Sequence, residues 1–234
     1  MRKALSMVSV ASVFGIVALT APVTFAQSSG SFNYSANPLQ CVVNPQNGAL
    51  TGGIAGTVTT MSTTMKTSSG NGNVFVVTPA AVVGLLTDVT INTSKQSGNT
   101  LTSSSQAGVD FTVTATPLSN QAAPVVIPSG PVTYEDRFIQ ISTNLFTAIS
   151  TQCLATALPD GTSGCFLTFN ESTLGAHSFN WVITNLQAGT YGLAVKWSPS
   201  SLVQGLGNTA TCVGPVNLTV TQNKIFTPST GVSF

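Results

Sequence analysis

Short runs in which apolar residues alternate with Ser, Thr or Asn recur along the chain from Cys41 onward, and turn-forming residues separate them. The segment 108–116 is the clearest example, with apolar residues on one side and polar residues on the other: Val109, Phe111 and Val113 against Asp110, Thr112 and Thr114. A period of two residues is typical of a β-strand with one buried face. The pattern therefore predicts a mainly β protein, an antiparallel β-sandwich of immunoglobulin-like or jelly-roll-like type.

Other segments show the same alternation or a short apolar run. We predict strands at 74–78, 88–93, 165–170, 177–183, 191–197 and 216–220, with an edge strand at 125–127 in a proline-rich connector. Between the first two of these, Pro79 begins a segment, 79–86, for which a helical turn is expected.

Residues 134–153 depart from the β pattern. Their apolar residues are spaced by three or four positions: Tyr134, Phe138, Ile141, Leu145, Ile149 and Cys153. This spacing fits one face of an α-helix, and Thr133 with Asp136 resembles a capping box at its start. Frequent β-branched residues also permit a strand here. Because the helical period persists for so long, we predict one α-helix at about 134–153.

The N-terminus has the organisation of a signal peptide. Arg2 and Lys3 precede an apolar stretch, 7–19, and small residues surround a cleavage site after Ala26. The alternative is a membrane anchor, but the stretch is shorter than the roughly 20 apolar residues that a spanning helix needs. The sequence predicts a signal peptide at 1–26, a polar arm at 27–40 and a single β-rich domain at 41–234. No later segment predicts a membrane span, so we expect a secreted protein that is extracellular, periplasmic or at the cell surface.

The cysteine pattern agrees with export. The chain has four cysteines and one histidine, and the spacing between the cysteines does not fit a zinc site. Four cysteines allow three pairings. We favour Cys153–Cys165, because a Pro-Asp-Gly turn lies between them, and Cys41–Cys212 follows by elimination.

Charge excludes several classes of function. Removal of Arg2 and Lys3 with the signal peptide leaves five basic residues against six acidic ones. Nucleic-acid binding relies on clustered Lys and Arg, so we expect no nucleic-acid partner. The same argument disfavours anionic membrane surfaces. No cofactor or metal motif occurs, and we expect none to be bound.

Candidate catalytic residues are few. His177 is a possible general base, but it shares a predicted strand face with Phe179 and Trp181, which favours a buried, hydrogen-bonded structural histidine. Glu171 and Asp160 are candidates for glycoside hydrolysis, which requires two carboxyl groups facing one another. The sequence does not place these residues together.

Two further groups have structural explanations. The run Glu135-Asp136-Arg137 is interpreted as a helix start in which Arg137 pairs locally. Three aromatic residues suggest either a sugar-stacking platform or core, and their strand register with Leu and Val favours the core: Tyr191, Trp181 and Trp197.

Three segments together resemble a group of secreted bacterial proteins with no known activity. They are Tyr134-Glu-Asp-Arg-Phe with Ser142 and Leu145-Phe146, then Ala176-His-Ser-Phe-Asn-Trp-Val, then Cys212-Val-Gly-Pro with Val220-Thr-Gln. The resemblance covers the C-terminal half. It implies an exported, cysteine-bridged bacterial protein and assigns no catalytic residues.

Two functions follow as hypotheses. The first is a non-enzymatic interaction or structural module, serving adhesion, a matrix or ligand binding, whose partner is a cell-surface glycan or a protein. The second is an extracellular hydrolase that acts on a polysaccharide or another polymer. Export and a neutral Ser/Thr/Asn surface favour the first.

Overall fold

Two antiparallel β-sheets pack face to face in the computed structural model, which describes residues 31–55, 59–67, 72–92, 103–142, 144–145, 147–148 and 166–224. The large sheet contains β1 (Phe32–Asn37), β4 (Ile54–Ala55), β6 (Asn73–Asn92), β8 (Val125–Ile127), β10 (Phe166–Ser178), β11 (Trp181–Thr184) and β13 (Gly207–Lys224). The small sheet contains β5 (Thr59–Thr67), β7 (Ser103–Pro117), β9 (Val132–Ile141) and β12 (Gly189–Gln204). The predicted β-sandwich is confirmed.

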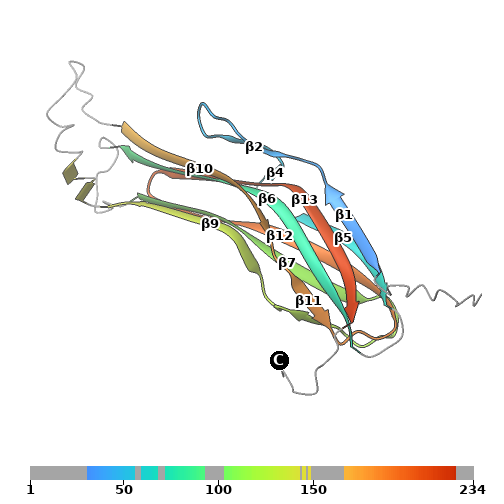
Figure 1. The fold of residues 1–234 in the computed structure, drawn as a ribbon. Coiled ribbons are helices and arrows are strands. Elements are labelled where there is room, and N and C mark those ends of the chain that lie inside the picture. Colours follow the sequence, from blue (N-terminus) through green and yellow to red (C-terminus); the bar gives the residue numbers. More distant parts are fainter. Residues whose placement is uncertain are drawn as a thin grey trace, which may run out of the picture.

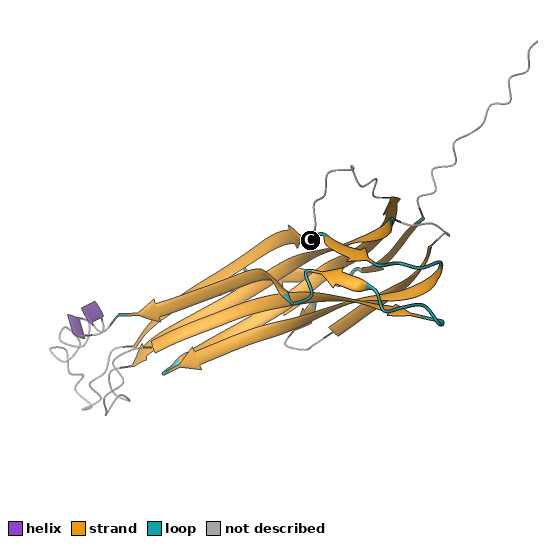
Figure 2. Ribbon diagram, turned by 90° about the horizontal axis from the view of Figure 1, so that it is seen from below, coloured by secondary structure: helices purple, strands orange, loops and turns teal. Residues whose placement is uncertain are grey.

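Long strands give the sandwich an extended shape, and the strands run along its length (Figures 1 and 2). The large sheet has the order β1-β13-β6-β11-β8, with β10 beside β6 and β4 beside β13. The small sheet has the order β5-β12-β7-β9. A separate hairpin of β2 (Cys41–Val43) and β3 (Leu50–Gly52) completes the described strands.

The core lies between the inner faces of the two sheets. Its largest fully buried side chains are aromatic: Trp181, Trp197, Tyr191, Phe75 and Phe111. Phe111 stacks on Trp197 at a centroid distance of 5.8 Å and on Tyr134 at 3.9 Å. The prediction that the two tryptophans and Tyr191 belong to the core is confirmed, so these rings do not form a sugar-stacking surface.

Strand β6 corrects the expectation of a helical turn at 79–86, because residues 73–92 form one continuous strand. Pro79 interrupts the pairing rather than the strand, since proline has no N–H to donate to a neighbour. On that side β10 ends at Ser178 and β11 begins at Trp181, so the break lies opposite Pro79.

The helix expected at 134–153 is wrong over its first part, since residues 132–141 form β9. Strand β9 pairs with β7, and this tertiary pairing outweighs the helical spacing. Phe138, which fitted the apolar helix face, is exposed on β9. Helical residues are described at 144–145 and 147–148, and the rest of 143–153 lies outside the described residues.

The disulfide Cys41–Cys212 is confirmed, with a Cα–Cα distance of 5.9 Å across 171 positions of sequence. It fixes the β2–β3 hairpin to β13, and both cysteines are buried. A buried disulfide of this kind is typical of proteins that fold in an oxidising compartment. Cys153, Cys165 and the signal peptide lie outside the described residues. Within the predicted arm, 27–40, residues 32–37 form β1.

Candidate functional site

The first candidate site is a cleft of about 430 Å³ between the edge strands β9 and β10, where the two sheets meet. It is lined by Val132, Thr133, Tyr134, Ala176, His177, Ser178 and Phe179. Among the described strands, β9 pairs with β7 and β10 pairs with β6, so neither strand has a partner on the cleft side.

A histidine–carboxylate contact and an arginine–carboxylate ion pair bridge the two sheets along this edge. His177 Nε2 lies 2.7 Å from Glu135 Oε2, and Arg137 Nη1 lies 3.1 Å from Glu171 Oε1. The His177–Glu135 contact is close but poorly aligned for a hydrogen bond. The expectation that Arg137 pairs locally at a helix start is therefore wrong, because its partner belongs to the opposite sheet.

A β-bulge on β9 determines the directions in which Tyr134 and Glu135 point. Val109 pairs with Glu135, whereas the next residue, Asp110, pairs with Thr133, so Tyr134 is an extra residue on β9. Such a bulge bends the strand and redirects its side chains. As a result Tyr134 packs into the core while Glu135, directly after it, reaches His177.

Tyr134 lines the cleft on the side of the core. Its hydroxyl donates a hydrogen bond of 2.7 Å to the carbonyl of Pro79, at the break between β10 and β11. Burial raises the pKa of the Tyr134 phenol above its usual range, and a backbone contact with Phe179 offsets part of that rise. The phenol therefore stays protonated as a structural donor.

The cleft lacks most of a catalytic apparatus within the described residues. A nucleophilic mechanism requires a hydroxyl or thiol bonded to the base, and no such group is hydrogen-bonded to His177 in this part of the chain. No group of three or more His, Cys, Asp or Glu side chains is placed to hold a metal ion there. The expectation of a buried, hydrogen-bonded His177 on one strand face with Phe179 and Trp181 is wrong. His177 is partly exposed and its Nε2 has no aligned hydrogen bond. Phe179 is exposed and Trp181 is buried, because the strand is interrupted between Ser178 and Trp181.

The other candidate residues are not brought to one centre. Glu171 is largely exposed and contacts Arg137, further along the same edge. Asp136 points away from the cleft and accepts two hydrogen bonds from the Gln106 amide, at 2.9 and 3.1 Å. Asp160 lies outside the described residues.

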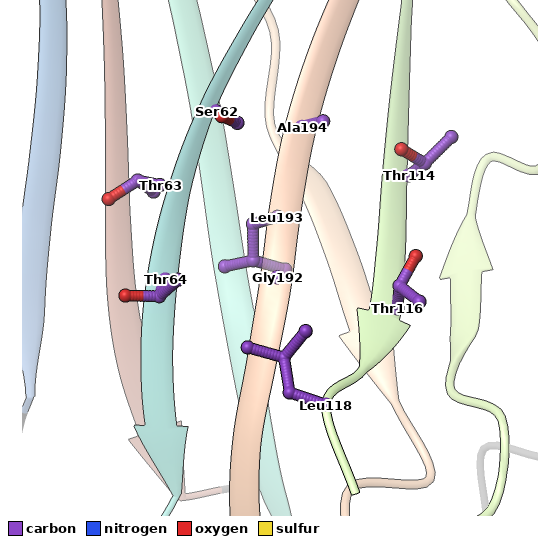
Figure 3. Close-up of a pocket in the computed structure, with 9 residues that line it drawn as sticks. All are labelled: Ser62, Thr63, Thr64, Thr114, Thr116, Leu118, Gly192, Leu193 and Ala194. Carbon is purple, nitrogen blue, oxygen red and sulfur yellow. The ribbon is translucent and has the colours of Figure 1, made fainter.

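The second candidate site is a trough of about 480 Å³ on the outer face of the small sheet (Figure 3). Ser62 and Thr64 of β5 form one wall, and Thr114 and Thr116 of β7 form the other. Gly192 and Ala194 of β12 form its floor. Leu118 also lines the trough. We call this surface the hydroxyl trough.

Strand register explains the hydroxyl trough. Gly192 pairs with both Thr64 and Thr116, and Ala194 pairs with both Ser62 and Thr114. Because the floor residues have little or no side chain, the hydroxyl-bearing walls stand above them. The next outward-facing pairs beyond the two ends of the trough place Lys66 and Lys196 on the same face of the sheet. No charged side chain lines the trough itself.

Sequence reasoning identified the polar side of 108–116 but missed the trough. The signal was present in the alternation of Thr112, Thr114 and Thr116. The small residues Gly192 and Ala194 form a floor only because β12 lies between β5 and β7, and the sequence does not show this strand order.

Comparison with known proteins finds no protein-family model that matches this chain and no curated protein with significant similarity to it. In the part of the chain that the structure describes, no helix is long and apolar enough to cross a membrane.

Proposed function

We propose that this protein is a secreted or cell-surface, non-enzymatic interaction module that binds a neutral polysaccharide through the hydroxyl trough. The observation that carries this proposal is the uncharged lining of the trough, with hydroxyl groups on both walls and a flat floor. Hydroxyl groups both donate and accept hydrogen bonds, which suits the many hydroxyls of a sugar chain. The lining covers two successive cross-strand rows, those of Gly192 and Ala194, so the trough accommodates a short stretch of a sugar chain.

Export supports the proposal. The N-terminal residues have the pattern of a cleaved signal peptide, and the Cys41–Cys212 disulfide suits an oxidising compartment. The resemblance of the C-terminal half to secreted bacterial proteins agrees with the same placement. A low total charge also suits a neutral partner, since it supplies little attraction for charged polymers.

Filling the trough tests the proposal. Ala194→Phe places a ring between the two hydroxyl walls, and we expect it to weaken binding to dextran or hydroxyethyl cellulose at the trough at least tenfold. The melting temperature should change little, because Ala194 faces away from the core. Isothermal titration calorimetry measures the affinity, and Ala123→Phe, on an exposed loop, is the matched control. Unchanged affinity for the trough variant would rule out the trough as the binding site.

An extracellular hydrolase centred on the cleft is the second candidate, because the structure places the His177 imidazole beside the Glu135 carboxylate at the cleft. We expect His177→Gln to lower the free energy of unfolding by no more than about 1 kcal/mol, because His177 is partly exposed and its contact with Glu135 is not an aligned hydrogen bond. Denaturant unfolding checks this value. A variant of unchanged stability that loses about 10²–10⁴-fold in polymer hydrolysis would instead establish His177 as a catalytic base.

A further inference from the structure

The outer face of the large sheet carries two exposed aromatic rings at its edge. Phe32 is 61 % exposed and Tyr34 is 65 % exposed, and their ring centroids lie 6.3 Å apart on β1. Tyr34 pairs with Thr219, whose neighbours Leu218 and Val220 point into the core. Residues paired across strands share a face, so both rings point outward, on the side of the molecule opposite to the hydroxyl trough.

A row of polar groups runs from Tyr34 across the sheet. Strand register places Thr219 beside Tyr34 and Thr78 beside Thr219. The Thr219 hydroxyl donates to the Thr78 carbonyl at 3.3 Å, and the Thr78 hydroxyl donates to Asn180 Oδ1 at 2.6 Å. At about 4.8 Å between strands, the row from Tyr34 to Asn180 spans about 14 Å, which suits a short oligosaccharide.

The strand that carries the rings is anchored to both sheets. Strand β1 pairs with β13 over its full length. Asn33, between the two aromatic residues, points the other way and donates its side-chain amide to the carbonyl of Thr64, at 2.6 Å. This bond joins β1 to β5 of the small sheet. The rings are therefore presented on a fixed backbone, which lowers the entropic cost of binding.

We propose that Phe32 and Tyr34, with the row Thr219, Thr78 and Asn180, form a second binding site for a neutral sugar chain. The aromatic rings stack on pyranose rings, and the hydroxyl and amide groups bind sugar hydroxyls. This inference rests on the proposed function, because it assigns the same class of ligand to the opposite face. With one site on each outer face, a single molecule cross-links two polysaccharide chains and acts as a matrix-forming protein.

A cross-linking assay distinguishes a protein with two sugar-binding sites from a protein with one. The probes are dextran and hydroxyethyl cellulose, mixed with the full mature protein while light scattering is recorded. We expect wild-type protein to raise the scattering strongly and calorimetry to give two sites per molecule. The double variant Phe32→Ala/Tyr34→Ala should keep one site and lose the rise in scattering. Its retention on a polysaccharide-coated surface should fall by about 10²-fold through lost avidity.

The control is Phe138→Ala, which removes an exposed aromatic ring from the small sheet and should leave scattering unchanged. A double variant that scatters like the wild type would overturn the inference. A wild-type stoichiometry of one site, abolished by Ala194→Phe, would also overturn it while leaving the proposed function intact. If wild-type protein binds neither polysaccharide, the proposed function and this inference fall together.

Discussion

Replacing Cys41 and Cys212 together by serine is expected to lower the free energy of unfolding by about 4–5 kcal/mol. The disulfide closes a loop of 171 positions, so its loss releases a large conformational entropy in the unfolded chain. It also frees the β2–β3 hairpin, which β13 holds through Cys212. Urea unfolding monitored by tryptophan fluorescence measures the change.

Reduced wild-type protein is the control for this experiment, because it retains both sulfur atoms without the covalent link. Reduction also breaks the predicted Cys153–Cys165 disulfide, so the double variant is measured under the same reducing conditions, in which the two proteins should be equally stable. A loss below about 1 kcal/mol for the double variant would show that the N-terminal hairpin is not tied to the stability of the sandwich.

Trp181→Ala is expected to destabilise the fold by about 3–5 kcal/mol, the usual cost of removing a large buried ring. Trp181 is fully buried at the start of β11 and packs against Phe179 at a centroid distance of 4.9 Å and Tyr134 at 6.3 Å. The surrounding core relaxes only in part around such a deletion, so a cavity remains and adds to the loss of burial.

Phe179→Ala is the matched control, because Phe179 contacts the same tryptophan but is 41 % exposed. It should cost clearly less than Trp181→Ala in the same denaturant titration. Equal losses for the two variants would mean that the lateral edge of the sandwich, rather than its interior, determines stability.

Sequence periodicity predicted the inner faces of the sandwich well. The alternation in 108–116 and 191–197 corresponds to β7 and β12, and the edge strand at 125–127 is β8. These predictions succeed because one buried face imposes a period of two on each strand. The core aromatics followed from the same register.

Periodicity failed where tertiary pairing or a bulge decides the structure. The bulge at Tyr134 and the outward Phe138 gave β9 an apparent helical period. Pro79 suggested the start of a helical turn, yet it lies within β6, where its missing N–H faces the break between β10 and β11. In both places the deciding partner is distant in sequence.

The candidate surfaces were harder to predict than the core. Residues 32–37 were predicted to belong to a polar arm, but they form β1. Their alternation of aromatic or small residues with Asn and Ser is a strand pattern. The contacts His177–Glu135 and Arg137–Glu171 join β10 to β9, and the hydroxyl trough joins β5, β12 and β7. A sequence pattern identifies the polar side of each strand, but strand order determines which polar sides meet.

We propose that this protein binds a neutral polysaccharide without cleaving it. The most direct test incubates purified mature protein with hydroxyethyl cellulose or dextran and measures, in one sample, bound protein and newly formed reducing ends. We expect bound protein and no increase in reducing ends over a protein-free control. Reducing ends that accumulate with time, and that disappear in His177→Gln, would contradict it.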